Sequence, residues 1–374
     1  MTSFFTKSFH LINFPPLLSL TIFFIIGIIF HTIFTQFLII FLLILCSFLF
    51  THFKQTSLPK HLLPYAFFTL AGAWLHHKEL GDYDTFYTWI NHQKITVTGT
   101  VIDSAETVIN HKKTTAITVL ADIVATKNIT QKCNKLFVFY TKSNKNLEVG
   151  DTAAFYDVHC KKPASKDFQR YQMKEQIIAT IFDDAVTCEQ KHHPPYSLRN
   201  WLWNQKKRLL DGLKNKLSPE CFRFFSSLFL GNRACIKNEL EETNEQFKTW
   251  GISHFLARSG LHLVLFIFIW QTLFCIIPLP LLIKQIIIFL ISCIYFILTW
   301  TSAPFTRSFA LFAFNKICLF GRIPFHLLHY LTLVCFLFLL YCPLYVFFLD
   351  FQLSFALTFA LAWLNQVTAE HKKI

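Results

Sequence analysis

The sequence predicts a polytopic α-helical membrane protein with a small β-barrel inserted outside the membrane. Hydrophobic residues make up 53% of the 374 positions, and 45 residues are phenylalanine. A single water-soluble core does not absorb that much apolar surface. The apolar residues gather in the first third and the last two fifths of the chain, and the middle is polar. The chain therefore divides into two membrane parts around one soluble insert.

Eight apolar runs approach the roughly 20 residues that a helix needs to cross the hydrocarbon of a bilayer. The third run is short and contains Gly72. No small-residue cleavage site follows the first run, so we expect a retained helix instead of a signal peptide. The predicted spans are residues 14–33, 36–53, 62–76, 254–277, 281–300, 305–320, 325–342 and 347–365.

Positive charges orient these spans. Lys7 precedes the first span, the connection at residues 32–35 is uncharged, and Lys54 and Lys60 occupy the next connection. Cytoplasmic loops carry the excess of lysine and arginine, so the N-terminus is predicted to be cytoplasmic and the insert external. The later charges on the cytoplasmic side are Lys284, Arg322 and residues 371–373.

The insert, residues 78–190, contains five runs with strand character. Five short strands in about ninety residues fit a small OB-like β-barrel, a fold whose open face often binds single-stranded nucleic acid. A β-domain without any ligand is the equally weighted alternative, because a fold does not determine a function. The predicted strands are residues 95–101, 114–125, 135–141, 152–158 and 176–182.

A connector at residues 191–250 follows, with an amphipathic helix predicted at residues 198–218. Leucines form one stripe of this helix, and lysines and arginines cover the rest. The helix either lies on the outer membrane surface or offers cations to a polyanion that enters the membrane part.

Three cysteines of the external region are candidates for a disulfide, because disulfides persist in oxidising compartments. They are Cys133, Cys160 and Cys188. Their pairing does not follow from the sequence.

The most unusual stretch is GISHFLARSGLHL at residues 251–263, which opens an apolar run. On a helix, its basic residues lie four positions apart and form a polar stripe, and its small residues form a packing stripe beside it. The alternative is that the basic side chains only snorkel to the interface. The polar stripe comprises His254, Arg258 and His262, and the packing stripe comprises Ser253, Ala257 and Gly260.

Several motifs resemble the ComEC family of competence proteins, the inner-membrane channels for DNA uptake. The sequences LGNR at 230–233, GISHFLARSGLHL, Pro304 with Arg307, and DFQLSF at 350–355 follow one another in the order found in that family. Within the insert, VGD at 149–151 and DFQRYQMKEQIIAT at 167–180 are similar to the family's external OB-like domain. The resemblance covers nearly the whole chain.

The resemblance implies a channel that passes one DNA strand across the bacterial cytoplasmic membrane in natural transformation. It also implies as partners single-stranded DNA, the lipid bilayer and other competence proteins, including an ATP-driven motor, since the sequence has no glycine-rich phosphate loop. Arg258 departs from the family, which commonly has an apolar residue there. The predicted DNA path is lined by His254, Arg258, Ser259, His262, Arg307 and Gln352.

The membrane domain at residues 251–374 is expected to be incomplete. Many family members continue with further helices and a domain resembling metallo-β-lactamases, so we expect a truncated or split copy, with either a homo-oligomer or a separate chain supplying the rest. The sixteen histidines include no H-x-H pair and no H-E-x-x-H motif. We therefore expect no metal site, no cofactor and no enzymatic activity.

Two rival functions remain open: a membrane-anchored OB-fold binding module without transport, and a small-molecule permease. Arginines within apolar runs discriminate between an anchor and a pore. Arg258 and Arg307 each cost roughly 2.5–3.5 kcal/mol on insertion scales, which an anchor has no reason to retain.

Overall fold

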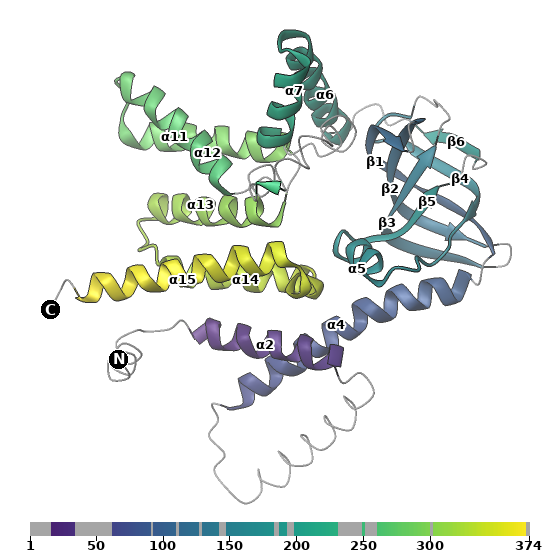
Figure 1. Cartoon of the computed structure of the whole chain (residues 1–374), viewed down its shortest axis with the longest axis horizontal. Helices are drawn as coiled ribbons and strands as arrows, with labels where there is room; N and C mark the ends of the chain where they lie inside the picture. Colours follow the sequence, from purple (N-terminus) through teal and green to yellow (C-terminus); the bar gives the residue numbers. More distant parts are fainter. Residues whose placement is uncertain are drawn as a thin grey trace, which may run out of the picture. The chain divides into compact units, whose positions relative to one another are not determined.

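The computed structural model describes residues 16–33, 62–90, 93–109, 112–126, 129–141, 147–182, 187–192, 198–230, 249–250, 260–299 and 302–371 (Figure 1). The chain divides into two compact units. The first comprises residues 1–81 and 306–374, and the second comprises residues 82–305. Each unit is described below by itself.

The first unit is helical. It contains α2 (Pro16–Ile33), the first part of α4 (Leu62–Ile90), most of α13 (Ala303–Gly321), α14 (Leu327–Tyr341), the short 3₁₀-helix η2 (Pro343–Phe347) and α15 (Leu349–His371). Its core joins α2, α14, η2 and α15, because each contributes buried apolar side chains that pack together. The largest of these side chains are Phe24, Ile28, Leu331, Leu339, Phe351 and Phe355.

Helices α2 and α4 approach closely because each has a glycine at the crossing. A Cβ atom on Gly27 would lie 2.0 Å from the carbonyl oxygen of Thr69, and one on Gly72 would lie 2.2 Å from that of Phe24. No side chain fits at either position, so the two backbones are in direct contact. Small residues allow such approaches between apolar helices.

The two helices cross in a parallel sense. Along α2, Phe23 contacts Tyr65, Gly27 contacts Thr69 and Ala73, and His31 reaches residues 76 and 77. Later residues of one helix thus contact later residues of the other.

We expect Gly27→Ala to destabilise the first unit by roughly 1–3 kcal/mol, because the added methyl group meets a backbone atom that does not move aside. The matched control is Gly81→Ala on the same pair of helices, where an added Cβ meets no atom within 4 Å. Thermal unfolding of the purified full chain measures both variants. Equal unfolding temperatures for the two would contradict the close crossing.

The second unit contains a mixed sheet of six strands in the order β5-β3-β2-β1-β4-β6. Strands β1 to β4 form a Greek key, since β4 returns to lie beside β1. Strand β5 pairs with β3 in parallel, and the other neighbours are antiparallel. The strands are β1 (Lys94–Ile109), β2 (Lys112–Ala125), β3 (Thr130–Thr141), β4 (Thr152–His159), β5 (Ile177–Phe182) and β6 (Thr187–His192).

The five strands predicted from the sequence are confirmed as strands, with β1 and β3 longer than expected. The sixth strand, β6, was not predicted. Within the described residues no pairing joins β5 to β6, so the sheet is open where a closed barrel was expected. The Greek-key order is shared with OB-folds, which are partly open barrels, but the OB assignment itself stays a prediction.

Helix α4 runs unbroken into the second unit and packs on the sheet. Phe86 lies against Phe137 of β3 with 5.8 Å between the ring centroids, and the hydroxyl of Tyr83 donates to Gln172 Oε1 at 2.9 Å. Gln172 belongs to α5 (Lys166–Lys174), a helix that the sequence did not predict. The expected domain boundary at residues 77–78 thus falls inside α4, and the boundary between the two compact units lies after Gly81.

The VGD motif forms the turn before β4. Gly150 has a φ of 101°, which side chains rarely adopt, and its amide donates to the carbonyl of Val101. The fully buried carboxylate of Asp151 accepts from the amide of Glu148 at 2.9 Å. The motif therefore shapes the sheet and carries no evident ligand chemistry.

The rest of the second unit is helical. The predicted amphipathic helix is confirmed as α6 (Leu198–Lys216), which has no buried residue. It is followed by α7 (Pro219–Phe225), the π-helix η1 (Ser226–Leu230), α11 (Gly260–Ile276) and α12 (Leu281–Leu298).

One helix in the described part of the chain, α12, is both long and apolar enough to cross a membrane, with a mean hydropathy of 2.5. Shorter apolar helices lie at Pro16–Thr32, Gly260–Ile276 and Leu327–Tyr341. The number of membrane crossings therefore stays a prediction.

The expected disulfide is not present, because Cys133, Cys160 and Cys188 are all thiols. Three strands separate β3, which carries Cys133, from β6, which carries Cys188. Cys188 lies opposite Phe155, five residues before Cys160. A disulfide requires Cα atoms within about 7 Å, which this arrangement does not offer.

We expect all three cysteines to react with a maleimide after denaturation without any reductant. In the native protein Cys160 should stay unlabelled, because burial raises the pKa of its thiol to about 12 and removes the reactive thiolate. The exposed Cys221 of α7 serves as the positive control. A cysteine of the three that is labelled only after reduction would contradict the structure.

Candidate functional site

The polar stripe predicted from the sequence lies only partly within the described residues. His254, Arg258 and Ser259 of the predicted DNA path, and Ser253 and Ala257 of the packing stripe, fall outside them. Gly260 and His262 open helix α11. Nothing in the structure tests the packing role of Gly260.

His262 is buried among aromatic side chains instead of facing an open path. It is 9% exposed, and the ring of Phe229 meets it edge to face at 6.0 Å between centroids. Phe229 belongs to the π-helix η1, and its carbonyl accepts a hydrogen bond of 2.7 Å from the hydroxyl of Tyr295 on α12. Tyr295 in turn stacks on Phe266 of α11 at 4.1 Å.

This aromatic cluster, Phe229, His262, Phe266 and Tyr295, joins three helical segments. A π-helix leaves backbone groups without their usual helical partners, and the hydroxyl of Tyr295 satisfies one of them. His262 is therefore part of a packed joint in the second unit, and its predicted place on a conducting path is not supported by its surroundings.

Arg307 lies in the first unit, on α13, and faces α15. Its Nη1 donates to Oγ1 of Thr358, and its guanidinium carbon lies 5.7 Å from the ring centroid of Phe355. Thr358 also donates to the carbonyl of Ser354, so its hydroxyl links the arginine to the α15 backbone.

No ion pair of Arg307 with an acidic side chain is found among the residues that the structure describes. The pairs Lys94–Asp157 and Lys162–Asp84 do not involve it. Its Nε and the hydroxyl of Ser354 are buried and have no hydrogen-bond partner. Nearly all buried polar groups in proteins are paired. Arg307 and Ser354 therefore present a positive charge and two unused donors to the same helix interface.

Gln352 contacts the backbone of a neighbouring element, and its place on a DNA path stays a prediction. Its Nε2 donates to the carbonyl of Val346 at 2.6 Å, which satisfies a backbone group of η2. In the same DFQLSF motif, Phe351 and Phe355 pack into the apolar core. Most residues of this motif therefore have structural contacts. Ser354 is the residue of the motif that lies near Arg307.

Sequence reasoning missed Ser354 and Thr358 as companions of Arg307. Their spacing of four residues on an apolar helix places them on one face, and this was the available signal. It also missed Lys316, a buried lysine whose Nζ lies 5.3 Å from the ring centroid of Phe312 on α13. None of these three positions stands out by composition alone.

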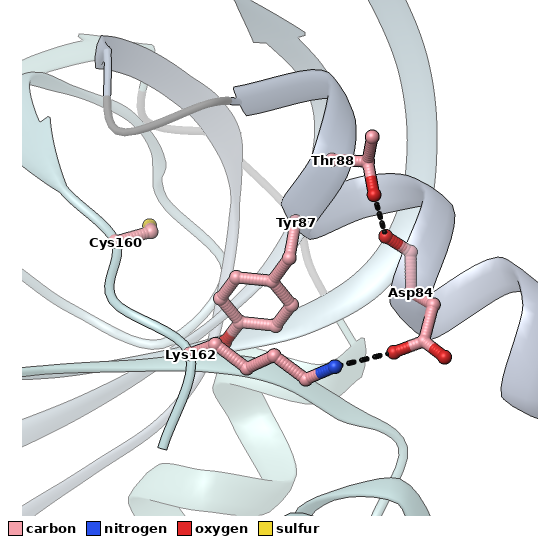
Figure 2. A pocket seen from close by; sticks show the side chains of 5 residues that line it. All are labelled: Asp84, Tyr87, Thr88, Cys160 and Lys162. Atoms are coloured by element: carbon pink, nitrogen blue, oxygen red, sulfur yellow. Dashed lines mark hydrogen bonds and ion pairs between the residues drawn. The ribbon is translucent and has the colours of Figure 1, made fainter. Parts of the chain in front are cut away.

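The second unit has an open pocket of about 450 Å³ where α4 meets the sheet (Figure 2). Its charges neutralise each other, since Lys162 Nζ lies 2.6 Å from Asp84 Oδ1. The Tyr87 hydroxyl already donates to the carbonyl of Ile178, and burial raises its pKa. The thiol of Cys160 is protonated at neutral pH. These groups anchor α4 to the sheet and form no nucleophile–base pair.

Histidine, cysteine and acidic side chains form no group of three with the geometry to hold a metal ion anywhere in the described ranges. Arg307 with Ser354 and Thr358 is therefore the site whose chemistry points to a ligand, and that chemistry selects an anion. Arginine binds carboxylates and phosphates through several donors at once.

No curated protein and no solved structure matches the chain. A family model described as Competence protein matches residues 228–373. The match includes α11 to α15 and therefore Arg307, Ser354 and Thr358. This part of the chain is similar to competence proteins, which supports the resemblance to the ComEC family.

Proposed function

We propose that this protein is the membrane channel component that takes up single-stranded DNA across the cytoplasmic membrane in natural transformation. The observation that carries the proposal is the half-buried guanidinium of Arg307, whose buried Nε has no hydrogen-bond partner, within a region similar to competence proteins. A cation that costs several kcal/mol to keep among apolar helices is expected to have a function.

A DNA backbone suits this site chemically. Each phosphate supplies the acceptor oxygens that Arg307 Nε and Ser354 Oγ lack. The net charge of +13 favours the approach of any polyanion, independent of its sequence. Strand passage without base recognition requires this kind of backbone contact.

The parallel crossing of α2 and α4 supports a multi-pass arrangement. If both helices span the bilayer, they cross it in the same direction. The chain between them must then cross the bilayer back, which one further span achieves. The sequence predicts one span there, at residues 36–53. This agrees with a cytoplasmic N-terminus and an external sheet domain.

A topology reporter tests this arrangement. An enzyme that is active only outside the membrane, fused after Asn144, should be active, and the same enzyme fused after Lys373 should be silent. Positive charges near the ends of the spans set this orientation. The reverse pattern would rule out an external β-domain.

DNA uptake tests the role of Arg307. In a competent host that depends on this gene, we expect Arg307→Gln to reduce transformation by roughly tenfold or more, since a buried charge–phosphate contact is worth at least about 1.4 kcal/mol. Arg307→Lys should retain part of the activity because it keeps the charge but not the fork of donors. Protein abundance is measured alongside.

Arg322→Asn is the matched control. Arg322 is exposed in the turn after α13 and has a φ of 54°, a conformation that asparagine accepts. This variant should transform like the parent. Parental transformation by Arg307→Gln at equal abundance would mean that the arginine is structural.

A small-anion permease is the second candidate, because Arg307, Ser354 and Thr358 form a compact set of donors. It predicts that the host transforms without this gene, and that anion flux into vesicles containing the protein falls in Arg307→Gln.

A further inference from the structure

Three histidine rings form a connected row in the first unit. His31 Nδ1 lies 2.8 Å from His76 Nδ1, and His31 Nε2 lies 3.1 Å from His77 Nδ1. The ring centroids of His31 and its two neighbours are 5.0 and 5.1 Å apart, with the planes tilted by 69° and 67°. His31 uses both of its nitrogens and lies between the other two.

The helix crossing places these rings together. His31 follows Gly27 by four residues on α2, and His76 follows Gly72 by four residues on α4. Each histidine thus lies one turn beyond a glycine of the close crossing. His31 and His76 are 2% and 1% exposed, and His77 is exposed.

The geometry is not that of a metal site. A metal ion needs one nitrogen from each ring to converge on a single point at about 2.0–2.1 Å. Here His31 turns a different nitrogen to each neighbour, so the nitrogens lie along a chain instead of around a point. Hydrogen bonds between ring nitrogens hold a row of this kind together.

A count of the ring protons shows what the row can bind. A neutral imidazole carries one N–H and one bare nitrogen, and each of the two contacts requires one proton between its nitrogens. Three neutral rings have three protons: two occupy the contacts, and the third lies on the outer nitrogen, Nε2, of either His76 or His77.

One additional proton fits without loss of either contact. It occupies the bare Nε2, and the positive charge then lies on any one of the three rings, because moving a contact proton across transfers the charge to the next ring. A second additional proton would place two N–H groups face to face in one contact. The row therefore has room for a single proton.

We propose that His31, His76 and His77 form a proton-binding site, in which one proton enters at exposed His77 and is shared with buried His31 and His76. Histidine is the side chain whose ordinary pKa lies nearest to neutral pH, and one ring of the row, His77, is exposed. This proposal rests on the α2–α4 contact and not on the proposed DNA transport.

The elements packed around the row carry other titratable groups. Lys78 lies over the ring of Trp74 at 5.6 Å, and the ring of His76 lies 5.7 Å from that of Phe347 in η2. Among the side chains that the structure describes in these segments of the first unit, the others are Tyr65 and Glu79 on α4, His329, Tyr330, Cys335 and Tyr341 on α14, Tyr345 in η2, and Asp350 on α15.

The test is a pH titration of the full chain in lipid nanodiscs, with the histidine ring nitrogens labelled and observed by NMR. In the wild type the three rings should titrate together and take up one proton. In His31→Phe the signals of His76 and His77 should no longer change together, because the ring that joins them and shares the charge is gone.

His31→Gln is the second variant. Its amide keeps hydrogen bonds to both neighbours but takes no proton, so it separates sharing from packing. His326→Phe is the matched control, since the rings of His326 and His329 form a separate pair at the start of α14, with 5.6 Å between their centroids. It should leave the joint change of the three signals intact.

A joint change of the His76 and His77 signals that persists in both His31 variants, with spectra that show a folded protein, would overturn the proposal. Uptake of three protons at three separate pH values would also overturn it. A one-to-one spectral change on addition of zinc at neutral pH, requiring all three histidines, would identify a metal site instead.

Discussion

A polar side chain in an apolar helix must find a partner, and this constraint organises both units. Short hydroxyls find one in their own helix: Ser292, Thr299 and Thr332 each donate to the carbonyl four residues earlier. Longer side chains need a second element. Tyr295 therefore ties α12 to η1, and Gln352 ties α15 to η2. Hydrogen bonds of polar side chains thus fix how apolar segments are oriented against each other, because apolar contacts are not directional.

The sequence predicted those elements whose patterns are long and regular. Alternation identified the first five strands, and a leucine stripe among basic residues identified α6. Strand β6 has the polar sequence TCEQKH and lies at the edge of the sheet, so it has neither alternation nor burial to reveal it. Helix α5 is short and polar, and only its serine N-cap marks its start.

The candidate site was predictable only in part, because a sequence motif does not distinguish a lining residue from a packing residue. Arg307 was found from its charge in an apolar run. His262 and Gln352 also belonged to motifs of the resemblance, yet the structure packs one among aromatic rings and uses the other to satisfy a carbonyl. Ser354 and Thr358 needed the partner helix to be recognised, since their importance comes from the guanidinium beside them.

Arg307 and the histidine row satisfy the partner constraint in opposite ways. The three rings of His31, His76 and His77 complement one another, so the row is complete as it stands and gains only a proton. Arg307 has donors left over after its bond to Thr358, and only an acceptor from outside the described residues completes them. We therefore propose an anionic ligand for the site at α13 and α15, and a proton for the row at the α2–α4 crossing. The first unit thus has two polar centres whose chemistries do not overlap.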